Sequence, residues 1–311
     1  MSYQEQVLKA GDGYQLALRV YEADAPKAVV KCIHGMEEHQ DRYRPFAEYL
    51  QAAGYTVVTA DLRGHGENAP KLSHIADKDG DQRLLEDEEA ILGMIHERWA
   101  GVPVILFAHS MGTIIARVFL QKRSREYRKV VLSGYPNPNS AAGAGIVMAE
   151  TLASFKGAKG YSRTLDNMVL GAFSKAVPDA KTPLDWLSVN PENVERYAGD
   201  PLCGARFTIG SYNTLFRLIA QMNKPEKYEE VQEELPILLI SGKDDPCTGG
   251  EKGRANSRAV LEKAGFRNIS VITYDHMRHE ILNETDRKKV CRDLRDFFLG
   301  GPDSGTRDGI T

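Results

Sequence analysis

A serine that could act as a nucleophile interrupts an apolar segment about a third of the way along the chain. Residues 102–115 read VPVILFAHSMGTII, so the polar pair His109-Ser110 lies between an apolar run and a segment with helical spacing. Ala108, Ser110 and Gly112 fit the small-x-Ser-x-Gly pattern of a sharp strand-to-helix turn that exposes a nucleophilic serine. A serine at the start of a helix also serves as an ordinary N-cap. The motif alone therefore allows two interpretations.

A second motif, IHGMEEH, directly follows an earlier apolar run. Its His-Gly turn would point a backbone N–H group, that of Met36, at the space above Ser110. With the N–H group of Met111 it would form an oxyanion hole, which stabilises the negative charge that develops on a carbonyl oxygen under attack. His34 and His39 could instead bind a metal, but they match no zinc signature. We expect no metal site here.

Two later segments could supply the partners that a catalytic serine needs. The segment SGKDDP contains Asp244 and Asp245, and the segment HMRHE contains His276 and His279. A serine hydroxyl is a poor nucleophile until a histidine removes its proton, and an acid must orient that histidine. The chain order serine, aspartate, histidine is the order of α/β-hydrolases. The residues themselves leave both aspartates and both histidines as candidates.

The elements around these motifs predict an α/β fold. Short apolar runs, typical of strands buried on both faces, alternate with helical patterns, which favours a mostly parallel central sheet with helices on both faces. Residues 14–21 alternate in polarity and predict an edge strand. The predicted buried strands are 28–33, 56–60, 103–108, 129–133, 236–241 and 269–274, and the predicted helices are 42–53, 81–99, 112–122 and 286–299. Because each candidate residue follows a strand, all should gather at one edge of the sheet.

This strand–helix rhythm is interrupted once. Residues 136–233 are mostly helical and richer in Gly, Ala, Asn and Pro, which predicts a helical cap (lid) inserted into the fold. The core would then comprise residues 1–135 and 234–299. The small polar residues 300–311 predict a disordered tail.

Composition excludes several function classes. The chain has 311 residues, of which 42% are hydrophobic and 27% charged, with a net charge of −3, so we expect no nucleic-acid partner. The N-terminus lacks the apolar core of a signal peptide, and we expect no membrane-spanning segment. The four cysteines are widely scattered, which fits free thiols in a cytoplasmic protein.

Taken together, the motifs resemble a known family. HGMEEHQDRY, DLRGHGEN, AHSMGT, SGKDDP and RHEILNE occur in the order found in α/β-hydrolases of the monoacylglycerol lipase and lysophospholipase group. The segment DWLSVNPENVERYAGDPLC within the predicted cap is similar to bacterial members of that group. The resemblance extends over about residues 10–299.

The resemblance implies a role for each site residue. It makes Ser110 the nucleophile and the N–H groups of Met36 and Met111 the oxyanion hole. It selects Asp245 over Asp244 as the acid, because the family's acid directly precedes the proline, and it selects His279 over His276, because the family's histidine directly precedes the glutamate. Asp61, Arg63 and His65 are expected to shape a turn and to take no part in the chemistry.

The expected function is hydrolysis of carboxylic esters through an acyl-enzyme, without a metal or organic cofactor. The resemblance implies a single-chain lipid substrate, either a monoacylglycerol or a lysophospholipid. Short-chain carboxylesterases and other acyl hydrolases or transferases share the same fold and are the alternative. A catalytically silent, ligand-binding member of the fold is a more remote one. Apolar segments in the cap would line an acyl channel or bring the protein into transient contact with a membrane surface.

Overall fold

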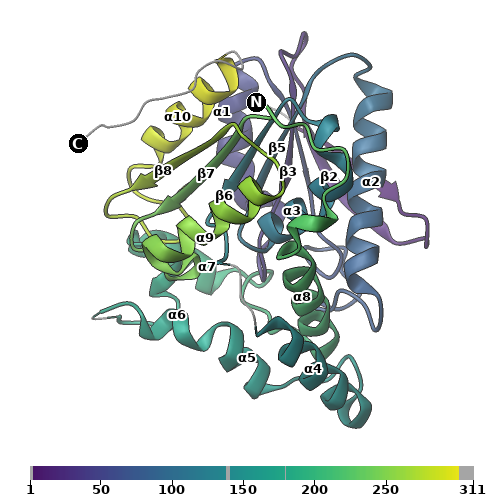
Figure 1. The fold of residues 1–311 in the computed structure, drawn as a ribbon, viewed down its shortest axis with the longest axis vertical. Coiled ribbons are helices and arrows are strands. Elements are labelled where there is room, and N and C mark those ends of the chain that lie inside the picture. Colours follow the sequence, from purple (N-terminus) through teal and green to yellow (C-terminus); the bar gives the residue numbers. More distant parts are fainter. Residues whose placement is uncertain (1–2, 138–140, 179, 301–311) are drawn as a thin grey trace.

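The protein is built around one open, twisted sheet (Figure 1). The computed structural model describes residues 3–137, 141–178 and 180–300. Within them, eight strands form the sheet in the order β1-β2-β4-β3-β5-β6-β7-β8. The strands are β1 (Gln4–Lys9), β2 (Gln15–Tyr21), β3 (Val29–Ile33), β4 (Thr56–Ala60), β5 (Val104–His109), β6 (Lys129–Ser133), β7 (Ile237–Gly242) and β8 (Ile269–Tyr274).

The six strands from β4 to β8 in this order are parallel, whereas β1 and β2 are antiparallel to their neighbours. This is the expected mostly parallel α/β arrangement. Five of the strands, β3 to β7, are buried along their whole length, which explains their continuous apolar sequences.

One expectation about the sheet edge is wrong. β2 is not an edge strand, because β1 pairs with it from Gln4 opposite Val20 to Lys9 opposite Gln15. The sequence QEQVLK is too polar to suggest a strand, and its mostly exposed or half-exposed side chains are those of a true edge.

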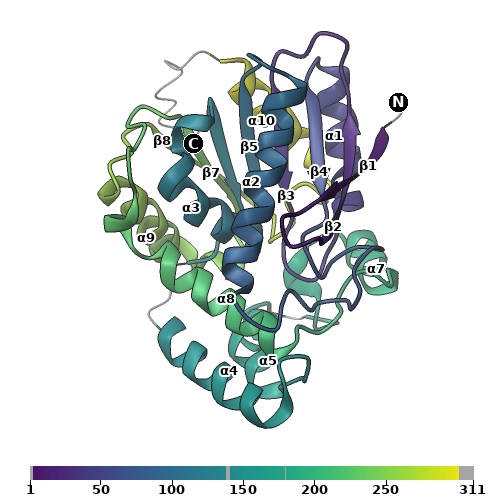
Figure 2. The same ribbon diagram turned by 90° about the vertical axis from the view of Figure 1, so that its right-hand side faces the viewer.

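Helices cover both faces of the sheet (Figure 2). On one face, α1 and α10 bury Phe46, Leu50, Leu294 and Phe298 in a single apolar cluster. On the other face, α2, α3 and α9 contribute to the larger cluster. These helices are α1 (Arg44–Ala52), α2 (Gly80–Arg98), α3 (Met111–Arg123), α9 (Gly250–Lys263) and α10 (Arg287–Leu299). The sequence patterns missed α9, whose few buried positions give little apolar periodicity.

In the described part of the chain, five further α-helices lie between β6 and β7, at one end of the sheet (Figure 1). They are α4 (Ala142–Lys156), α5 (Arg163–Val169), α6 (Gly171–Lys175), α7 (Pro191–Gly199) and α8 (Ile209–Met222). They form the segment called the cap below. α8 joins the main core through Leu215 and Leu218, so the division into cap and core domains stays a prediction. The predicted tail, apart from Gly300, lies outside the described residues.

Among the described residues, no helix combines the length and the apolar character needed to cross a bilayer.

Candidate active site

Ser110 occupies a strained turn between β5 and α3. Its backbone has φ 50° and ψ −120°, a conformation that costs a residue with a side chain about 1–3 kcal/mol. The Ser110 N–H group donates to the Ser133 carbonyl at 2.9 Å, which fixes the turn to β6. The hydroxyl makes no capping hydrogen bond to α3. The geometry is therefore that of a nucleophile elbow and not that of an ordinary N-cap.

Two glycines allow the elbow to pack against the preceding loop. A Cβ atom on Gly112 would lie 2.5 Å from the Ile33 carbonyl oxygen and 2.6 Å from that of His34. A Cβ atom on Gly35 would lie 3.0 Å from the Ser110 Cβ. Only glycine lets the start of α3, the end of β3 and the HGMEEH loop come this close together.

Ser110, His279 and Asp245 form a continuous hydrogen-bonded chain. His279 Nε2 lies 2.8 Å from Ser110 Oγ, and His279 Nδ1 lies 3.0 Å from Asp245 Oδ2. The other carboxylate oxygen, Asp245 Oδ1, accepts from the Cys247 N–H group at 2.9 Å. His279 and Asp245 are both buried. This is the geometry in which an imidazole can accept the proton of a serine hydroxyl.

The charge environment suits His279 to act as a base. Burial lowers the pKa of the imidazole, but the charge and hydrogen bond of Asp245 outweigh it and raise the net pKa above the ordinary value. By contrast, burial lowers the pKa of neighbouring His109 to about 3, so that ring stays neutral. His109 packs against His279 with ring centroids 4.7 Å apart.

The competing residues lie away from this chain. Asp244 is exposed, and its N–H group donates to the Met277 carbonyl at 3.1 Å. His276 is also exposed, in a loop where its φ is 55°. The acid and the histidine that meet at Ser110 are thus Asp245 and His279.

A cavity of about 680 Å³ opens above Ser110. Met36 and Met111 line it beside the serine, together with many apolar residues of the cap. Trp186 of the cap packs on His279, with ring centroids 4.9 Å apart, and Phe173 packs on Trp186 at the same distance. The sequence patterns did not single out these rings, which form an aromatic cover over the histidine. The apolar cap residues around the cavity include Met168, Val169, Leu170, Leu215, Phe216 and Ile219.

A buried ionic network of Glu38, Arg42 and Glu280 contacts the HGMEEH loop and the residue next to His279. Glu38 accepts from the Gly35 N–H group at 2.6 Å and from the Arg42 guanidinium at 3.0 Å. Arg42 also donates to both carboxylate oxygens of Glu280, the residue after His279. Burial raises the pKa of Glu280, but Arg42 lowers it further, to about 2. The sequence patterns gave these three residues no role, since Glu280 lies 238 positions from Arg42 and no local motif joins them.

Asp61 and Arg63, which were expected to be structural, hold turns, and so does His34, which was considered as a metal ligand. Asp61 accepts from the Gln40 N–H group at 2.8 Å, and Arg63 donates to Asp87 through two hydrogen bonds of 2.6 Å. His34 Nε2 accepts from the Leu62 N–H group at 2.9 Å. Because burial lowers the pKa of His34 to about 4, its ring is neutral, as this acceptor role requires.

The fold and this site define the class of protein as an α/β-hydrolase with a serine, a histidine and an aspartate in contact. Residues 24–286 match the family described as serine aminopeptidase, S33, and the chain belongs to this family. It is a serine hydrolase related to lipases.

Three relatives illustrate this similarity. A monoacylglycerol lipase of Mycolicibacterium smegmatis is 27% identical over 292 residues, which cover 92% of this chain and 94% of the relative. Phospholipase YtpA of Bacillus subtilis is 25% identical over 89% of this chain and 97% of its own length. The crystal structure of a thermostable carboxyl esterase from Bacillus coagulans has a TM-score of 0.84 and 25% identity, with 96% of this chain and 98% of that chain covered.

Proposed function

We propose that the protein hydrolyses carboxylic esters of single-chain lipids through an acyl-enzyme on Ser110. The observation that carries the proposal is the hydrogen-bonded chain Ser110–His279–Asp245 beneath a cavity of about 680 Å³ lined by apolar cap residues. The names of the relatives, a monoacylglycerol lipase, a phospholipase and an esterase, support the same reaction class.

The first half-reaction forms the acyl-enzyme. His279 Nε2 takes the hydroxyl proton of Ser110 as Oγ attacks the ester carbonyl carbon, and Asp245 stabilises the resulting imidazolium. The N–H groups of Met36 and Met111 hold the oxyanion. Met111 is the first residue of α3, where the helix dipole also favours negative charge. His279 then gives its proton to the departing alcohol, and the C–O ester bond breaks.

Water completes the cycle by the same route. His279 removes a proton from a water molecule that attacks the acyl-enzyme carbonyl. The proton returns to Ser110 Oγ as the acid leaves, which regenerates the starting state.

The size and apolar lining of the cavity favour a single long acyl chain. Its apolar lining offers contact along the chain, and burial of a methylene group is worth about 0.8 kcal/mol. A monoacylglycerol or a lysophospholipid meets this description, since each carries one acyl chain on a small polar group.

Hydrolysis of p-nitrophenyl esters of increasing chain length, with Ser110→Ala as the matched control, tests this proposal. We expect kcat/KM to rise from the acetyl to the decanoyl ester, and Ser110→Ala to abolish turnover. A maximum at the shortest ester would instead favour the short-chain carboxylesterase. Tight ligand binding without turnover of any ester would favour the catalytically silent alternative.

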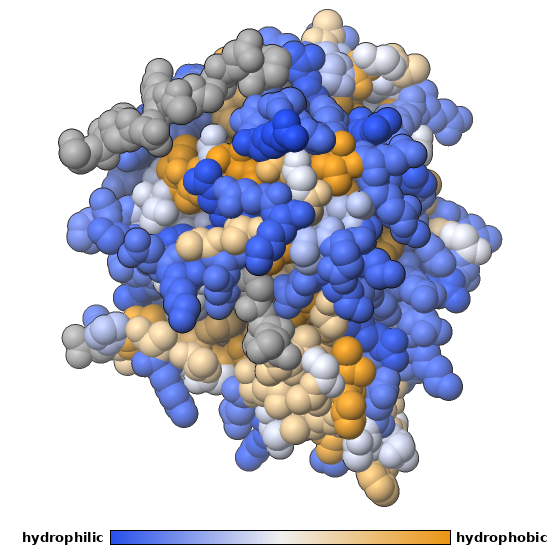
Figure 3. Space-filling view, in the orientation of Figure 1, coloured by the Kyte–Doolittle hydropathy of each residue, from blue (hydrophilic) through white to orange (hydrophobic). Residues whose placement is uncertain are grey.

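We further propose that the cap makes transient contact with membrane surfaces, where such substrates reside. Val147 and Phe155 on α4 are 64% and 84% exposed, and apolar residues gather over this end of the molecule (Figure 3). The double substitution Val147→Asp with Phe155→Asp should reduce co-sedimentation with phosphatidylcholine vesicles. Val7→Asp, at a 56% exposed position on edge strand β1, is the control and should leave sedimentation unchanged. Equal sedimentation of all three proteins would contradict this contact.

A cytoplasmic location, with small-molecule esters as the partners and no nucleic acid, completes the proposal. The four cysteines, which are free thiols, support a reducing compartment.

A further inference from the structure

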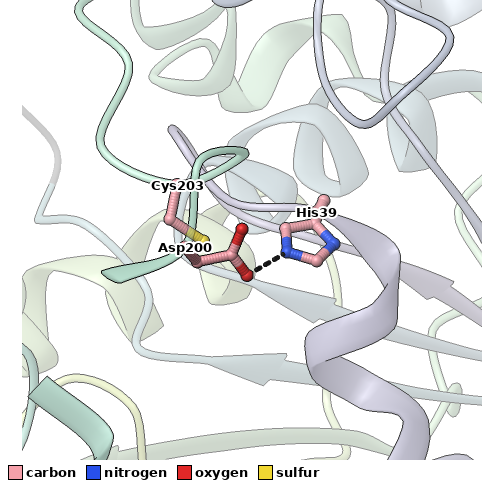
Figure 4. A group of neighbouring side chains, drawn as sticks. All are labelled: His39, Asp200 and Cys203. Carbon is pink, nitrogen blue, oxygen red and sulfur yellow. Dashed lines mark hydrogen bonds and ion pairs between the residues drawn. The ribbon is translucent and has the colours of Figure 1, made fainter. Parts of the chain in front are cut away.

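Apart from the catalytic residues, three side chains of the types that bind zinc meet at the junction of cap and core (Figure 4). His39 belongs to the loop after β3, whereas Asp200 and Cys203 belong to the turn after α7 in the cap. One ligand atom from each residue lies within 4.8 Å of the other two, and His39 Nε2 is 2.9 Å from Asp200 Oδ2. Asp200 and Cys203 lie 161 and 164 positions after His39 in the sequence, so no local sequence motif could reveal the group.

Hydrogen bonds hold the turn that carries Asp200 and Cys203 in shape, and these bonds do not involve the candidate ligand atoms Asp200 Oδ2 and Cys203 Sγ. The Cys203 N–H group donates to the Asp200 carbonyl at 3.0 Å, which brings the two side chains to one side of the turn. The Leu202 N–H group donates to Asp200 Oδ1 at 2.9 Å, so Oδ2 is the oxygen directed at His39. The Gly204 N–H group donates to the Glu37 carbonyl at 2.9 Å, which fastens the turn to the core loop.

An imidazole nitrogen, a thiolate and a carboxylate oxygen are all preferred ligands of Zn²⁺, which is usually tetrahedral. Burial raises the pKa of the Cys203 thiol, so the sulfur carries a proton in the metal-free protein. Binding would release this proton to solvent as the Zn–S bond forms. In the metal-bound state the ring proton of His39 would lie on Nδ1, so that Nε2 could donate its lone pair to the metal.

The surroundings give a cation access and suit its charge. A second cavity, of about 220 Å³, adjoins the group through His39 and Leu202. The guanidinium of nearby Arg42 is already paired with two carboxylates, those of Glu38 and Glu280. The ionisable side chains that line the cavity are mostly acidic and comprise Glu5, Arg19, His39, Asp41, Asp61 and Glu67.

We propose that His39, Asp200 and Cys203 form a zinc site that fastens the cap to the core, with a water molecule from the adjoining cavity as the fourth ligand. The site revises the expectation of no metal, which rested on the absence of a local zinc motif. Since its ligands come from both the core and the cap, bound zinc resists separation of the two parts.

The test is zinc binding by the full chain after treatment with a chelator. Zn²⁺ is titrated in competition with a chromophoric chelator, and Co²⁺ serves as a spectroscopic substitute that reports thiolate ligation by a charge-transfer band. The wild type should bind one Zn²⁺ per chain, and Cys203→Ser and Asp200→Asn should each bind it at least about 100-fold more weakly. Cys291→Ser is the matched control, since Cys291 is a buried free thiol on α10, and it should bind like the wild type.

Thermal melting separates ligand loss from misfolding. Zn²⁺ should raise the melting temperature of the wild type and of Cys291→Ser, because it binds the folded state. It should not raise that of Cys203→Ser or Asp200→Asn, whose metal-free melting temperatures should stay close to that of the wild type. If Cys203→Ser fails to fold, the result for Asp200→Asn decides whether the site binds zinc, since the Asp200 side chain is partly exposed and its replacement should not disturb folding.

Two results would overturn the proposal. One is a wild type that binds no Zn²⁺ in the competition. The other is binding that survives in both Cys203→Ser and Asp200→Asn. If that binding also abolishes ester hydrolysis, the metal lies on the second candidate group, Asp245, Cys247 and His279.

Discussion

Replacement of Asp245 by asparagine should disable the base without disturbing the fold. Asp245 Oδ1 accepts from the Cys247 N–H group, and Oδ2 faces His279 Nδ1. In Asp245→Asn the amide oxygen must keep accepting from the Cys247 N–H group, because the reverse orientation would place the amide NH₂ donor against the Cys247 N–H donor. The amide NH₂ group then faces His279 Nδ1, which must accept. The ring proton therefore moves to Nε2, and His279 can no longer take the proton of Ser110.

The expected loss follows from this change of tautomer. The wrong tautomer in a serine–histidine–aspartate triad lowers kcat by about 10⁴-fold. At 1.36 kcal/mol per factor of ten, this corresponds to about 5.4 kcal/mol of lost transition-state stabilisation. The assay is steady-state hydrolysis of a p-nitrophenyl ester, with the melting temperature of the variant measured alongside. KM should change little, since the carboxyl group lies behind His279 and not against the substrate.

Asp244→Asn is the matched control. Asp244 is adjacent in sequence and exposed, and its side chain does not belong to the hydrogen-bonded chain, so this variant should keep wild-type kcat within about twofold. Asp245 is not the acid that orients His279 if folded Asp245→Asn keeps more than about a tenth of wild-type kcat, or if Asp244→Asn loses as much activity as Asp245→Asn.

Three further outcomes follow from the site. Catalysis needs neutral His279, whose pKa is lowered by burial but raised further by Asp245, so the acid limb of the pH profile of kcat should lie above pH 6.5. The limb should move to lower pH in Asp245→Asn, and an unmoved limb would contradict this role of Asp245. Burial raises the pKa of Glu37 from 4.5 to about 8, so the folded state retains a proton that the unfolded chain has lost, and stability falls as pH rises between these values. Glu37→Gln should therefore raise the melting temperature at pH 8 and hardly change it at pH 5. An equal rise in melting temperature at both pH values would contradict the raised pKa of Glu37. Ile219→Trp, on the cavity wall, should reduce kcat/KM for decanoyl esters about tenfold and spare acetyl esters; a uniform loss would speak against an acyl channel there.

Much of the fold could be predicted because its signals are local. Strands buried on both faces are short apolar runs, so the predicted strand at 56–60 coincides with β4 and the run at 129–133 coincides with β6. The edge strand β1 was missed, since its half-exposed, polar sequence has no such signal.

The site could be predicted only in part, because only some of its residues are marked by local sequence signals. Ser110, Asp245 and His279 each follow a strand, so their positions mark the same edge of a parallel sheet before any coordinates are known. The Arg42–Glu280 pair and the group around Cys203 depend on contacts across more than 150 residues. No motif in the sequence marks these residues as partners.

Labelling with a fluorophosphonate probe, followed by peptide mapping, tests whether Ser110 is the activated nucleophile. One probe molecule per chain should react, the label should lie on Ser110, and Ser110→Ala should stay unlabelled although folded. Asp245→Asn should be labelled far more slowly than the wild type, because the probe reacts with the same activated hydroxyl of Ser110. A label on another residue, or a folded wild type that does not react, would show that Ser110 is not the nucleophile.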